Sequence, residues 1–340
     1  MAQSESELQG ASDYRPSDTV FPHEARHPLP QHSPFVTHMP FRDLTGRVQR
    51  ETEFILPAAH IGGFADIYIG HFTEDDKSPP FSKVAIKVLR MTKEREVVER
   101  LSRSLVRETA VWQHLQHPNI LKFLGLARDS GKFCCPALIS PYCDNGTAND
   151  YLKSHPDVNT RLFLVRQLLS SPATNLRQAR LQIRGITNGL NYLHGMQVVH
   201  GDLKPSNILI HDDGRPLLCD FGQSRVLFHR GFTTKQAGTT RYQAPELFMG
   251  ENIDKAADVY SFSMTSYEIW TGRLPFSEIH LDVVIALNII QNDTRPAKPD
   301  PASRETELIW TILQACWRRI PMDRVSIGEV MRNLDHIFFS

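Results

Sequence analysis

The stretch HGDLKPSN, from His200 to Asn207, directly follows an apolar pair of valines and guides the interpretation of the whole sequence. It places Asp202 and Lys204 in the same loop as Asn207. A second short cluster begins downstream at Asp220. Phosphoryl transfer from a nucleotide needs a base for the attacking hydroxyl, oxygen ligands for Mg²⁺ and a cation on the transferred phosphate. These side chains supply that set in order, whereas chance acidic turns would account for only one of the two clusters.

A carboxylate farther upstream lies in an otherwise apolar helical pattern. The residues spaced to share one helix face are Leu101, Leu105, Glu108, Trp112 and Leu115. A buried carboxylate is costly unless a cation meets it, and Lys87 ends a predicted strand that would face the same region. Such a lysine can hold its ammonium against the phosphates of a nucleotide. A salt bridge from Glu108 to Arg103 or Arg107, within its own helix, is the alternative.

The composition is that of an ordinary soluble protein, with 41% hydrophobic and 22% charged residues and a formal net charge of zero. This balance gives no sign of a nucleic-acid-binding surface or a polybasic membrane anchor. The cysteines show no spacing typical of metal sites or disulfides, so reduced thiols are expected. The acidic N-terminus is no signal peptide, and no apolar run approaches the roughly 20 residues that span a bilayer. We expect a cytoplasmic protein without nucleic-acid partners or membrane insertion.

The character of the chain changes from about Phe41, and the end of the leader is set at residue 48. Residues 1–48 are rich in proline and lack helical or strand periodicity, which predicts a disordered leader. The leader could be a docking tail, although a tolerated extension is the simpler interpretation. Residues 49–338 begin with strand-like runs and continue with helical patterns. This order predicts an α+β architecture of two lobes with a cleft between them.

Several individual elements can be predicted. Strands are expected at Phe54–Leu56, Ile67–Ile69, Val84–Ile86 and Ala137–Ile139, and the turn Asp212–Pro216 predicts a hairpin. Two helical stripes comprise Ile183, Ile186, Leu190 and Leu193, then Val259, Phe262, Ser266 and Ile269 with Gly272 as a cap. The segment Leu168–Gln182 interrupts what would otherwise be one helix from Arg161 to His194. It is interpreted as a surface insertion, broken at Ser170-Ser171-Pro172.

From about Glu53 to Phe338 the sequence resembles the eukaryotic protein kinase domain. Within that superfamily it resembles the tyrosine-kinase-like group, particularly fungal members with the phosphate-loop sequence Gly62–Tyr68. Further matching motifs are Arg107-Glu108, His117–Ile120, Ala244-Pro245-Glu246, Asp258–Phe262, Gly272–Phe276, Cys316-Trp317, Pro321 and Arg324. The resemblance implies a bilobed fold with a small β-rich N-lobe at about 49–140 that carries one key helix. A hinge at 141–145 and a large helical C-lobe at 146–338 would follow.

The resemblance also implies a role for each matching residue. Lys87 and Glu108 would anchor the phosphates of ATP, Asp202 would accept the substrate proton, and Lys204 would neutralise the γ-phosphate. Asn207 and Asp220 would hold Mg²⁺. The residues expected around ATP are Ile61, Gly62, Gly63, Ile67, Ala85, Lys87, Ser140 as gatekeeper, Pro141, Tyr142 and Cys143 in the hinge, and Leu209.

Other residues would shape the catalytic and substrate-binding parts. Glu246 should pair with Arg324 beneath the protein substrate, and Asp258 should brace the catalytic loop. An aromatic stack is expected from Trp112, Phe123, Phe221 and His200. Lys204 and Thr239 resemble the serine/threonine-specific pattern, and dual specificity remains open.

The sequence departs from the family pattern at two places. His60, Gly62 and Ala65 occupy the three glycine positions of the phosphate loop, which predicts weaker or altered nucleotide binding. Gly201 replaces the arginine that usually pairs with a phosphorylated activation loop, so regulation should differ while the base is kept.

The resemblance favours an ATP- and Mg²⁺-dependent kinase that phosphorylates serine or threonine on a protein substrate, in intracellular signalling. A pseudokinase that acts as a nucleotide-binding scaffold is the alternative, supported by the departures above. A small-molecule kinase is less compatible, because such enzymes generally lack the Ala244-Pro245-Glu246 platform and its Arg324 partner.

Overall fold

The computed structural model describes residues 41–55, 65–73, 82–89, 105–106, 108–129, 136–154, 173–226, 240–298 and 304–339. The chain divides into two compact units, residues 1–37 and residues 38–340. All described residues belong to the second unit, so the elements below are parts of one body. Most of the predicted leader lies outside the described residues, as do the predicted phosphate-loop residues Ile61, Gly62 and Gly63 and the departing position His60.

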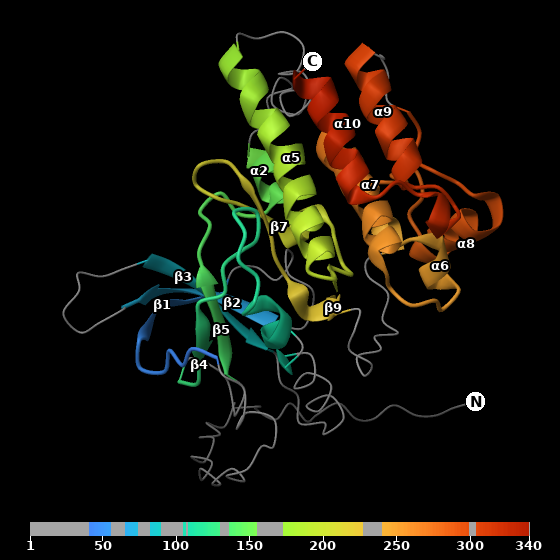
Figure 1. The fold of residues 1–340 in the computed structure, drawn as a ribbon. Helices are drawn as coiled ribbons and strands as arrows, with labels where there is room; N and C mark the ends of the chain where they lie inside the picture. Colours follow the sequence, from blue (N-terminus) through green and yellow to red (C-terminus); the bar gives the residue numbers. More distant parts are fainter. Residues whose placement is uncertain are drawn as a thin grey trace, which may run out of the picture. The chain divides into compact units, whose positions relative to one another are not determined.

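The first half of this unit contains an antiparallel five-stranded sheet in the order β1-β2-β3-β5-β4 (Figure 1). Its strands are β1 (Val48–Ile55), β2 (Ala65–Phe72), β3 (Ser82–Leu89), β4 (Gly125–Ala127) and β5 (Ala137–Pro141). Each of the four predicted strands overlaps a strand of this sheet, and β4 was not anticipated.

Strand register assigns the predicted nucleotide contacts to one face of the sheet. Ile67 pairs with Lys87, and Ala85 pairs with Ser140. Paired residues share a face, and so do residues two apart on one strand, so these four side chains lie on the same side. The opposite face is apolar and forms a separate core of Leu44, Val48, Tyr68, Phe72, Val84, Ile86, Val88, Ala127, Ala137 and Ile139.

Residues 41–47 pack against the sheet, so the predicted leader boundary at residue 48 lies too late. Leu44 is fully buried and its amide donates to Leu126 at 2.7 Å, while the Leu126 amide donates to Arg42 at 3.0 Å. Gly125 has φ +149°, and a Cβ there would lie 2.3 Å from the Arg42 carbonyl oxygen. A buried leucine and a glycine that permits close backbone approach therefore fix this segment on β4.

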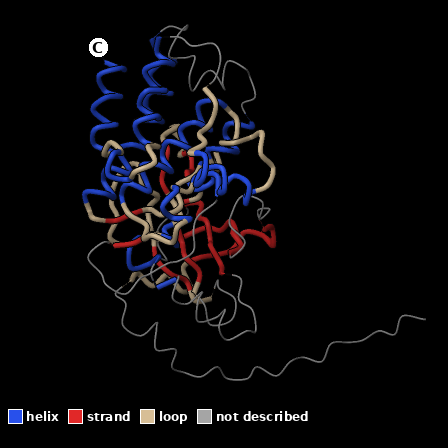
Figure 2. The backbone as a smooth tube through the Cα atoms, turned by 90° about the vertical axis from the view of Figure 1, so that its right-hand side faces the viewer, coloured by secondary structure: helices blue, strands red, loops and turns tan. Residues whose placement is uncertain are grey.

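The second half of the unit is mainly helical, and Figure 2 shows its helices apart from the strands of the sheet. Its elements are α2 (Ala148–Ser154), α5 (Ala173–Gly195), α6 (Pro245–Phe248), α7 (Lys255–Thr271), α8 (Asp282–Asn292), α9 (Arg304–Cys316) and α10 (Ile327–Phe339). Helices α5, α10 and α9 lie side by side (Figure 1). None of the described helices is long and apolar enough to cross a bilayer.

Helix α7 forms the centre of the helical part. Asp254 caps its start by accepting from the Ala257 amide at 2.8 Å, and Gly272 ends it in the left-handed conformation at φ 67°. Nearly the whole helix is buried, including the predicted stripe from Val259 to Ile269 and several polar side chains. Buried polar groups need partners, so α7 can serve as an anchor for neighbouring loops.

Helix α5 corrects the interpretation of the predicted insertion. It begins at Ala173, directly after the predicted break at Ser170-Ser171-Pro172. Residues 173–182 are continuous with the rest of the helix, so the second part of Leu168–Gln182 is an extension of α5 and no separate insertion. Residues 168–172 lie outside the described residues. The predicted stripe on α5 is buried, since Ile183, Ile186, Leu190 and Leu193 are each at most 5% exposed.

Two short antiparallel strand pairs flank the loops that contain the predicted chemical clusters. The predicted hairpin at Asp212–Pro216 joins β7 (Ile208–Ile210) to β8 (Pro216–Leu218). A second pair consists of β6 (Val198–Val199) and β9 (Arg225–Val226). Because β6 precedes His200 and β9 follows Ser224, this pairing brings the two predicted chemical clusters together.

Candidate active site

The predicted nucleotide contacts surround a cavity of about 360 Å³. Those that line it are Ile67, Ala85, Lys87, Ser140, Pro141, Tyr142, Cys143 and Leu209, together with Glu108, Asn207 and Asp220. Sequence reasoning did not assign to this cavity the further lining residues Trp112, Leu121, Gly146, Thr147, Asp150, Ser206 and Cys219. The wall is largely apolar with a few convergent polar groups, which is typical of a small-molecule site.

Lys87 lies between two carboxylates at one end of the cavity. Its Nζ donates to Glu108 Oε1 at 2.7 Å and to Asp220 Oδ1 at 3.0 Å. Glu108 is 2% exposed and reaches Lys87 from a helical stretch, 105–106 and 108–112 among the described residues. The predicted ion pair between the strand lysine and the helical carboxylate is therefore present. The alternative partners Arg103 and Arg107 lie outside the described residues. Leu115 lies beyond the helix end but is buried as its place in the stripe suggested.

The charges of Lys87 and Asp220 support each other, whereas burial, with the Asp220 charge adding to it, raises the pKa of Glu108 despite the Lys87 ammonium. Burial disfavours the charged lysine, but the Asp220 and Glu108 carboxylates outweigh that cost and raise the pKa of Lys87. Burial would likewise raise the pKa of Asp220, but the Lys87 ammonium prevails and lowers it. Lys87 therefore stays cationic and Asp220 stays anionic at neutral pH.

The loop after β6 brings three predicted side chains together. Lys204 Nζ donates to Asp202 Oδ2 at 2.7 Å. The Asn207 amide nitrogen donates to the Asp202 carbonyl oxygen at 2.7 Å and to Asp202 Oδ2 at 3.0 Å. Pro205 starts the 3₁₀ turn that ends at Asn207, because its fixed φ suits the first position of a helical turn. The turn holds Asn207 close enough to reach back to Asp202.

Asp258 of α7 holds the start of the same loop. Its Oδ2 accepts from the His200 amide at 2.7 Å, and its Oδ1 accepts from the Gly201 amide at 2.9 Å. His194 Nε2 lies 3.0 Å from Oδ2 as well. The Asp258 side chain is 1% exposed, so these hydrogen bonds satisfy a charge that water does not reach. The expected bracing contact is therefore present.

The expected aromatic stack is also present. Trp112 lies 5.1 Å from Phe123 and 6.0 Å from Phe221 between ring centroids, and His200 lies 5.5 Å from Phe221. Phe221 is fully buried. The stack links the helix that carries Glu108 to the loop that carries Asp202, with the residue after Asp220 between them.

Asn207 and Asp220 could hold a divalent metal ion. The two bonds donated by the Asn207 amide nitrogen leave its oxygen as the ligand atom, and Asp220 adds an ionised carboxylate. Among the described residues no group of three or more His, Cys, Asp and Glu side chains could hold a metal. This donor set fits an ion such as Mg²⁺, which usually binds one or two protein oxygens and completes its shell with phosphates and water.

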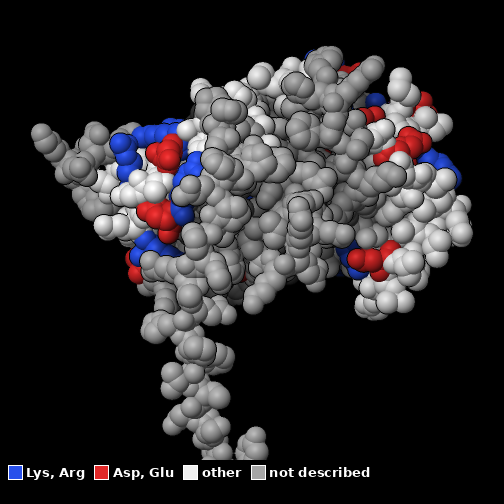
Figure 3. All heavy atoms as spheres, turned by 90° about the horizontal axis from the view of Figure 1, so that it is seen from below, with Lys and Arg blue, Asp and Glu red and all other residues white. Residues whose placement is uncertain are grey.

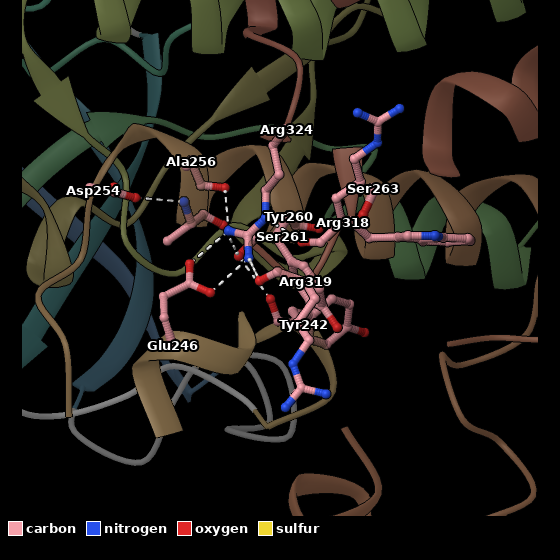
Figure 4. Close-up of polar contacts among 12 residues, drawn as sticks. Tyr242, Glu246, Asp254, Ala256, Tyr260, Ser261, Ser263, Arg318, Arg319 and Arg324 are labelled. Carbon is pink, nitrogen blue, oxygen red and sulfur yellow. Dashed lines mark hydrogen bonds and ion pairs between the residues drawn. The ribbon is translucent and has the colours of Figure 1, made fainter. Parts of the chain in front are cut away.

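Helix α6 is fixed by a buried ion pair between Glu246 and Arg324 (Figure 4). Arg324 donates to Glu246 Oε1 at 2.6 Å and to Oε2 at 2.7 Å, and also to the Ala256 carbonyl at 3.0 Å. The Tyr242 hydroxyl donates to Glu268 of α7, which fixes the residues just before Glu246. Thr239, the predicted specificity residue, lies outside the described residues.

The hinge strand is tied to its neighbour. The Tyr142 amide donates to the Lys83 carbonyl at 3.0 Å, and Lys83 Nζ lies 4.3 Å from the centroid of the Tyr142 ring. Lys83 also forms an ion pair with Asp144. Ser140, the expected gatekeeper, is 6% exposed at the back of the cavity. The contacts of Lys83 with Tyr142 and Asp144 were not predicted, because the sequence shows only a basic residue near the start of a strand.

Basic and acidic side chains of the described residues lie in mixed groups on the face drawn in Figure 3. Some of the exposed charges are paired, as Lys298 is with Glu307.

Comparison with known proteins agrees with this geometry. The family described as "Protein kinase domain" matches residues 62–339. Serine/threonine-protein kinase STY17 of Arabidopsis thaliana is 27% identical over 81% of this chain and 43% of its own length. Serine/threonine-protein kinase 12 of the same plant is 32% identical over 68% and 47%, and mitogen-activated protein kinase kinase kinase 12 of Rattus norvegicus is 25% identical over 83% and 27%. The chain spans less than half the length of these relatives.

A kinase domain implies ATP binding and use of a divalent metal. The cavity, the Lys87 ion pairs and the Asp202 loop lie within the matched residues. From this match, which covers most of the sequence, it follows that the chain belongs to the protein kinase domain family.

Proposed function

We propose that this protein transfers the γ-phosphoryl group of Mg²⁺·ATP to serine or threonine side chains of other proteins. The single observation that carries the proposal is the position of Lys87, which binds both Glu108 and Asp220 at the edge of the cavity. An ammonium held in this way is available to the α- and β-phosphates of ATP, because both its carboxylate partners are themselves fixed.

Asp202 would act as the base of the transfer. It would take the proton of the substrate hydroxyl while the new P–O bond forms and the bond to the β-phosphate oxygen breaks, releasing ADP. The ammonium of Lys204, 2.7 Å from Asp202 Oδ2, would offset the negative charge of the transferred group. The hydrogen bonds from Asp258 to the start of the loop would keep Asp202 in place throughout.

Asp220 and Asn207 would hold Mg²⁺, which would neutralise charge on the β- and γ-phosphates. Adenine would lie against the apolar wall formed by Ala85, Leu209 and the hinge. Hydrogen bonds to the hinge would use the Pro141 carbonyl and the Cys143 amide, because proline lacks an N–H but keeps its carbonyl.

Specificity for serine and threonine rests on Lys204 and on Thr239 by resemblance. The names of two of the relatives above carry the same specificity. We assign the protein to the tyrosine-kinase-like group, near its fungal members, on the sequence Gly62–Tyr68. A role in intracellular signalling in the cytoplasm follows from this assignment.

The pseudokinase alternative is disfavoured by the chemistry of the site. The phosphate anchor, base, metal ligands and γ-phosphate cation are all present within hydrogen-bonded contacts. The changed glycines at His60 and Ala65 affect how tightly the nucleotide is covered, and Ala65 adds only a methyl group.

The test is phosphate transfer from labelled ATP to a peptide library in which serine, threonine or tyrosine is the only acceptor. We expect transfer to serine and threonine peptides that stops when EDTA removes the metal. Binding of Mg²⁺·ATP without transfer to any peptide would instead support the scaffold alternative.

A further inference from the structure

Helix α8 has apolar side chains on its exposed side as well as on its buried side. Ile285 and Ile289 are fully buried and attach the helix to the body. On the opposite side of the helix, Val283, Val284 and Leu287 are 65%, 37% and 46% exposed. A surface helix normally carries polar residues on its outer side, so this arrangement indicates a surface that contacts another molecule.

This concentration of exposed apolar side chains is local. Among the described residues ten large apolar side chains are exposed, and four of them lie within residues 281–287. Another of the ten, Met249, directly follows α6, which packs against α8 (Figure 1). Scattered exposed apolar residues are ordinary, whereas a cluster marks an interaction surface. Leu281, Val283, Val284 and Leu287 make up the outer face of α8.

Arg241 ties the loop before α8 to the segment that would carry the protein substrate. Its guanidinium donates to three carbonyl oxygens at 2.8 Å each, those of Pro275, Phe276 and Ile279. Phe276 takes φ 57°, a conformation that bulky residues rarely adopt, and these bonds support it. Arg241 itself lies in a short turn that packs against α8 and leads into the Ala244-Pro245-Glu246 platform. Helix α8 is therefore fixed beside the predicted substrate platform.

The charges beside the outer face of α8 are negative. From residue 275 to residue 292 the chain carries Glu278 and Asp282, both exposed, and no lysine or arginine. A partner segment with lysine or arginine complements these carboxylates, while its apolar residues are buried against the outer face. Two copies of this chain that paired through the same face would instead bring carboxylates together without a cation from this stretch, which is unfavourable.

We propose that the outer face of α8 docks a segment of the protein substrate that combines apolar residues with lysine or arginine and lies apart from the phosphorylated residue. The proposal rests on the proposed function and deepens it by naming a feature of the substrate. Docking beside the platform raises the effective concentration of the acceptor hydroxyl at Asp202 and so lowers KM. The chemistry of transfer is unchanged, since no residue of the outer face lines the nucleotide cavity.

The test uses synthetic substrates that share one serine acceptor sequence from the peptide library. A flexible linker joins this sequence to a segment of about 12 residues, roughly three helical turns. The segment is built from leucine and lysine, from leucine and glutamate, or from serine and lysine. We expect the leucine-lysine segment to lower KM at least ~10-fold relative to the acceptor alone, with kcat unchanged. An equal gain from either of the other two segments would overturn the proposal.

A pair of matched variants locates the docking face. Leu308 lies on α9 and is 42% exposed, close to the 46% of Leu287, so Leu287→Asp and Leu308→Asp place the same charge at similar positions. Leu287→Asp should abolish the gain from the leucine-lysine segment and leave KM for ATP and for the acceptor alone unchanged. Leu308→Asp should keep the gain. Equal gains in the two variants would overturn the proposal, and Val283→Asp gives the same comparison if Leu287→Asp fails to fold.

Binding without transfer separates this proposal from the proposed function. Fluorescence anisotropy measures binding of the labelled leucine-lysine segment, without acceptor or nucleotide, to the wild type and to both variants. Binding that only Leu287→Asp weakens would support the docking face even if the protein transferred no phosphate, which would contradict the proposed function alone. Transfer to the acceptor peptide without such binding would contradict the docking proposal alone. A dimer that Leu287→Asp dissociates in analytical ultracentrifugation would assign the face to a second copy and overturn the proposal.

Discussion

The guanidinium of Arg324 donates hydrogen bonds to both carboxylate oxygens of Glu246, 78 residues away in the sequence, at 2.6 and 2.7 Å. Both side chains are buried, and Arg324 is further bonded to the carbonyl oxygens of Ala256, Arg318 and Arg319. The pair joins α6 to the segment before α10. In the proposed function it holds the platform on which a protein substrate lies.

Replacing Arg324 by alanine should destabilise the protein strongly. The change leaves the Glu246 carboxylate buried without its cation, which typically costs ~3–5 kcal/mol. Arg324→Lys should cost less but still weaken the site, because lysine cannot make the two parallel bonds. Urea unfolding measures both effects. Arg319→Ala is the control, since Arg319 is an exposed neighbour whose side chain, within the described part of the chain, binds the Ile290 carbonyl. Equal stability of the Arg324 and Arg319 variants would contradict the assigned role.

Asp202→Asn should separate binding from chemistry. The amide keeps the shape of the side chain but cannot accept the substrate proton, so we expect transfer to fall by at least ~100-fold, the scale of general-base contributions. Affinity for ATP should change little, because Lys87 and Asp220 are untouched. Initial rates and nucleotide titration of the same preparation check both points. Wild-type activity in the variant would exclude Asp202 as the base.

Activity should depend little on phosphorylation of the activation segment. A phosphate on Thr233 or Thr234, which lie outside the described residues, would find no arginine at position 201. Arg225 is part of β9, and Arg230 and Lys235 lie outside the described residues; holding any of these long side chains on a phosphate would cost conformational entropy. Changing both threonines to alanine should therefore alter kcat by less than ~10-fold, or about 1.4 kcal/mol.

Rates before and after phosphatase treatment, with phosphate loss verified by mass spectrometry, provide the measurement. Activity that is lost on dephosphorylation and returns on rephosphorylation would show that another basic site binds the phosphorylated loop.

Deletion of residues 168–182 should leave an active protein. The shortened α5 would start at Ile183 and keep its four buried apolar residues, and Arg184 would still reach Asp335 of α10 at 3.1 Å. Loop-length changes are thermodynamically mild, so a modest loss of thermal stability is expected from the shorter helix. Thermal unfolding and initial rates test this outcome. Deleting Leu168–Ile183, which also removes the first buried residue of the stripe, is the matched comparison and should be clearly less stable.

Cys143 should react slowly with alkylating reagents despite lining the nucleotide cavity. Burial raises its pKa to about 11, so at neutral pH it is almost entirely the unreactive thiol. Labelling should rise about tenfold for each pH unit, because the thiolate is the nucleophile, and Mg²⁺·ATP should slow it. Mass spectrometry of labelled peptides identifies the site, with Cys143→Ala as the control. Rapid labelling of the folded protein at neutral pH would contradict the raised pKa.

Much of the site could be anticipated because its residues are held by local sequence. Asp202, Lys204 and Asn207 lie within one turn, and the hairpin after Leu209 follows from its turn residues. Four strands of the sheet were found because β-branched and aromatic residues mark them. Their pairing order was not predicted, since it does not follow from composition.

What could not be predicted depends on contacts between distant residues. Residues 41–47 have loop-like composition, and the burial of Leu44 and the close approach of Gly125 hold them against β4. Strand β4 is three residues long, too short for a periodic signal. Residues 173–182 were assigned to an insertion because Ser170-Ser171-Pro172 breaks the helical pattern, yet they form the first part of α5. In each case tertiary packing, or the propagation of an existing helix, outweighs the conformational preference of the local sequence.

The bracing of the catalytic loop by Asp258 has a consequence for how the protein is made. The amides of His200 and Gly201 are bound by a carboxylate 58 and 57 residues later in the chain. Such non-local contacts form late, because a long loop must close before they are gained. A nascent chain that has emerged only as far as residue 250 already carries every residue of the transfer chemistry. In the proposed function, transfer would therefore begin only once α7 has followed, and synthesis itself would delay the activity until the fold is nearly complete.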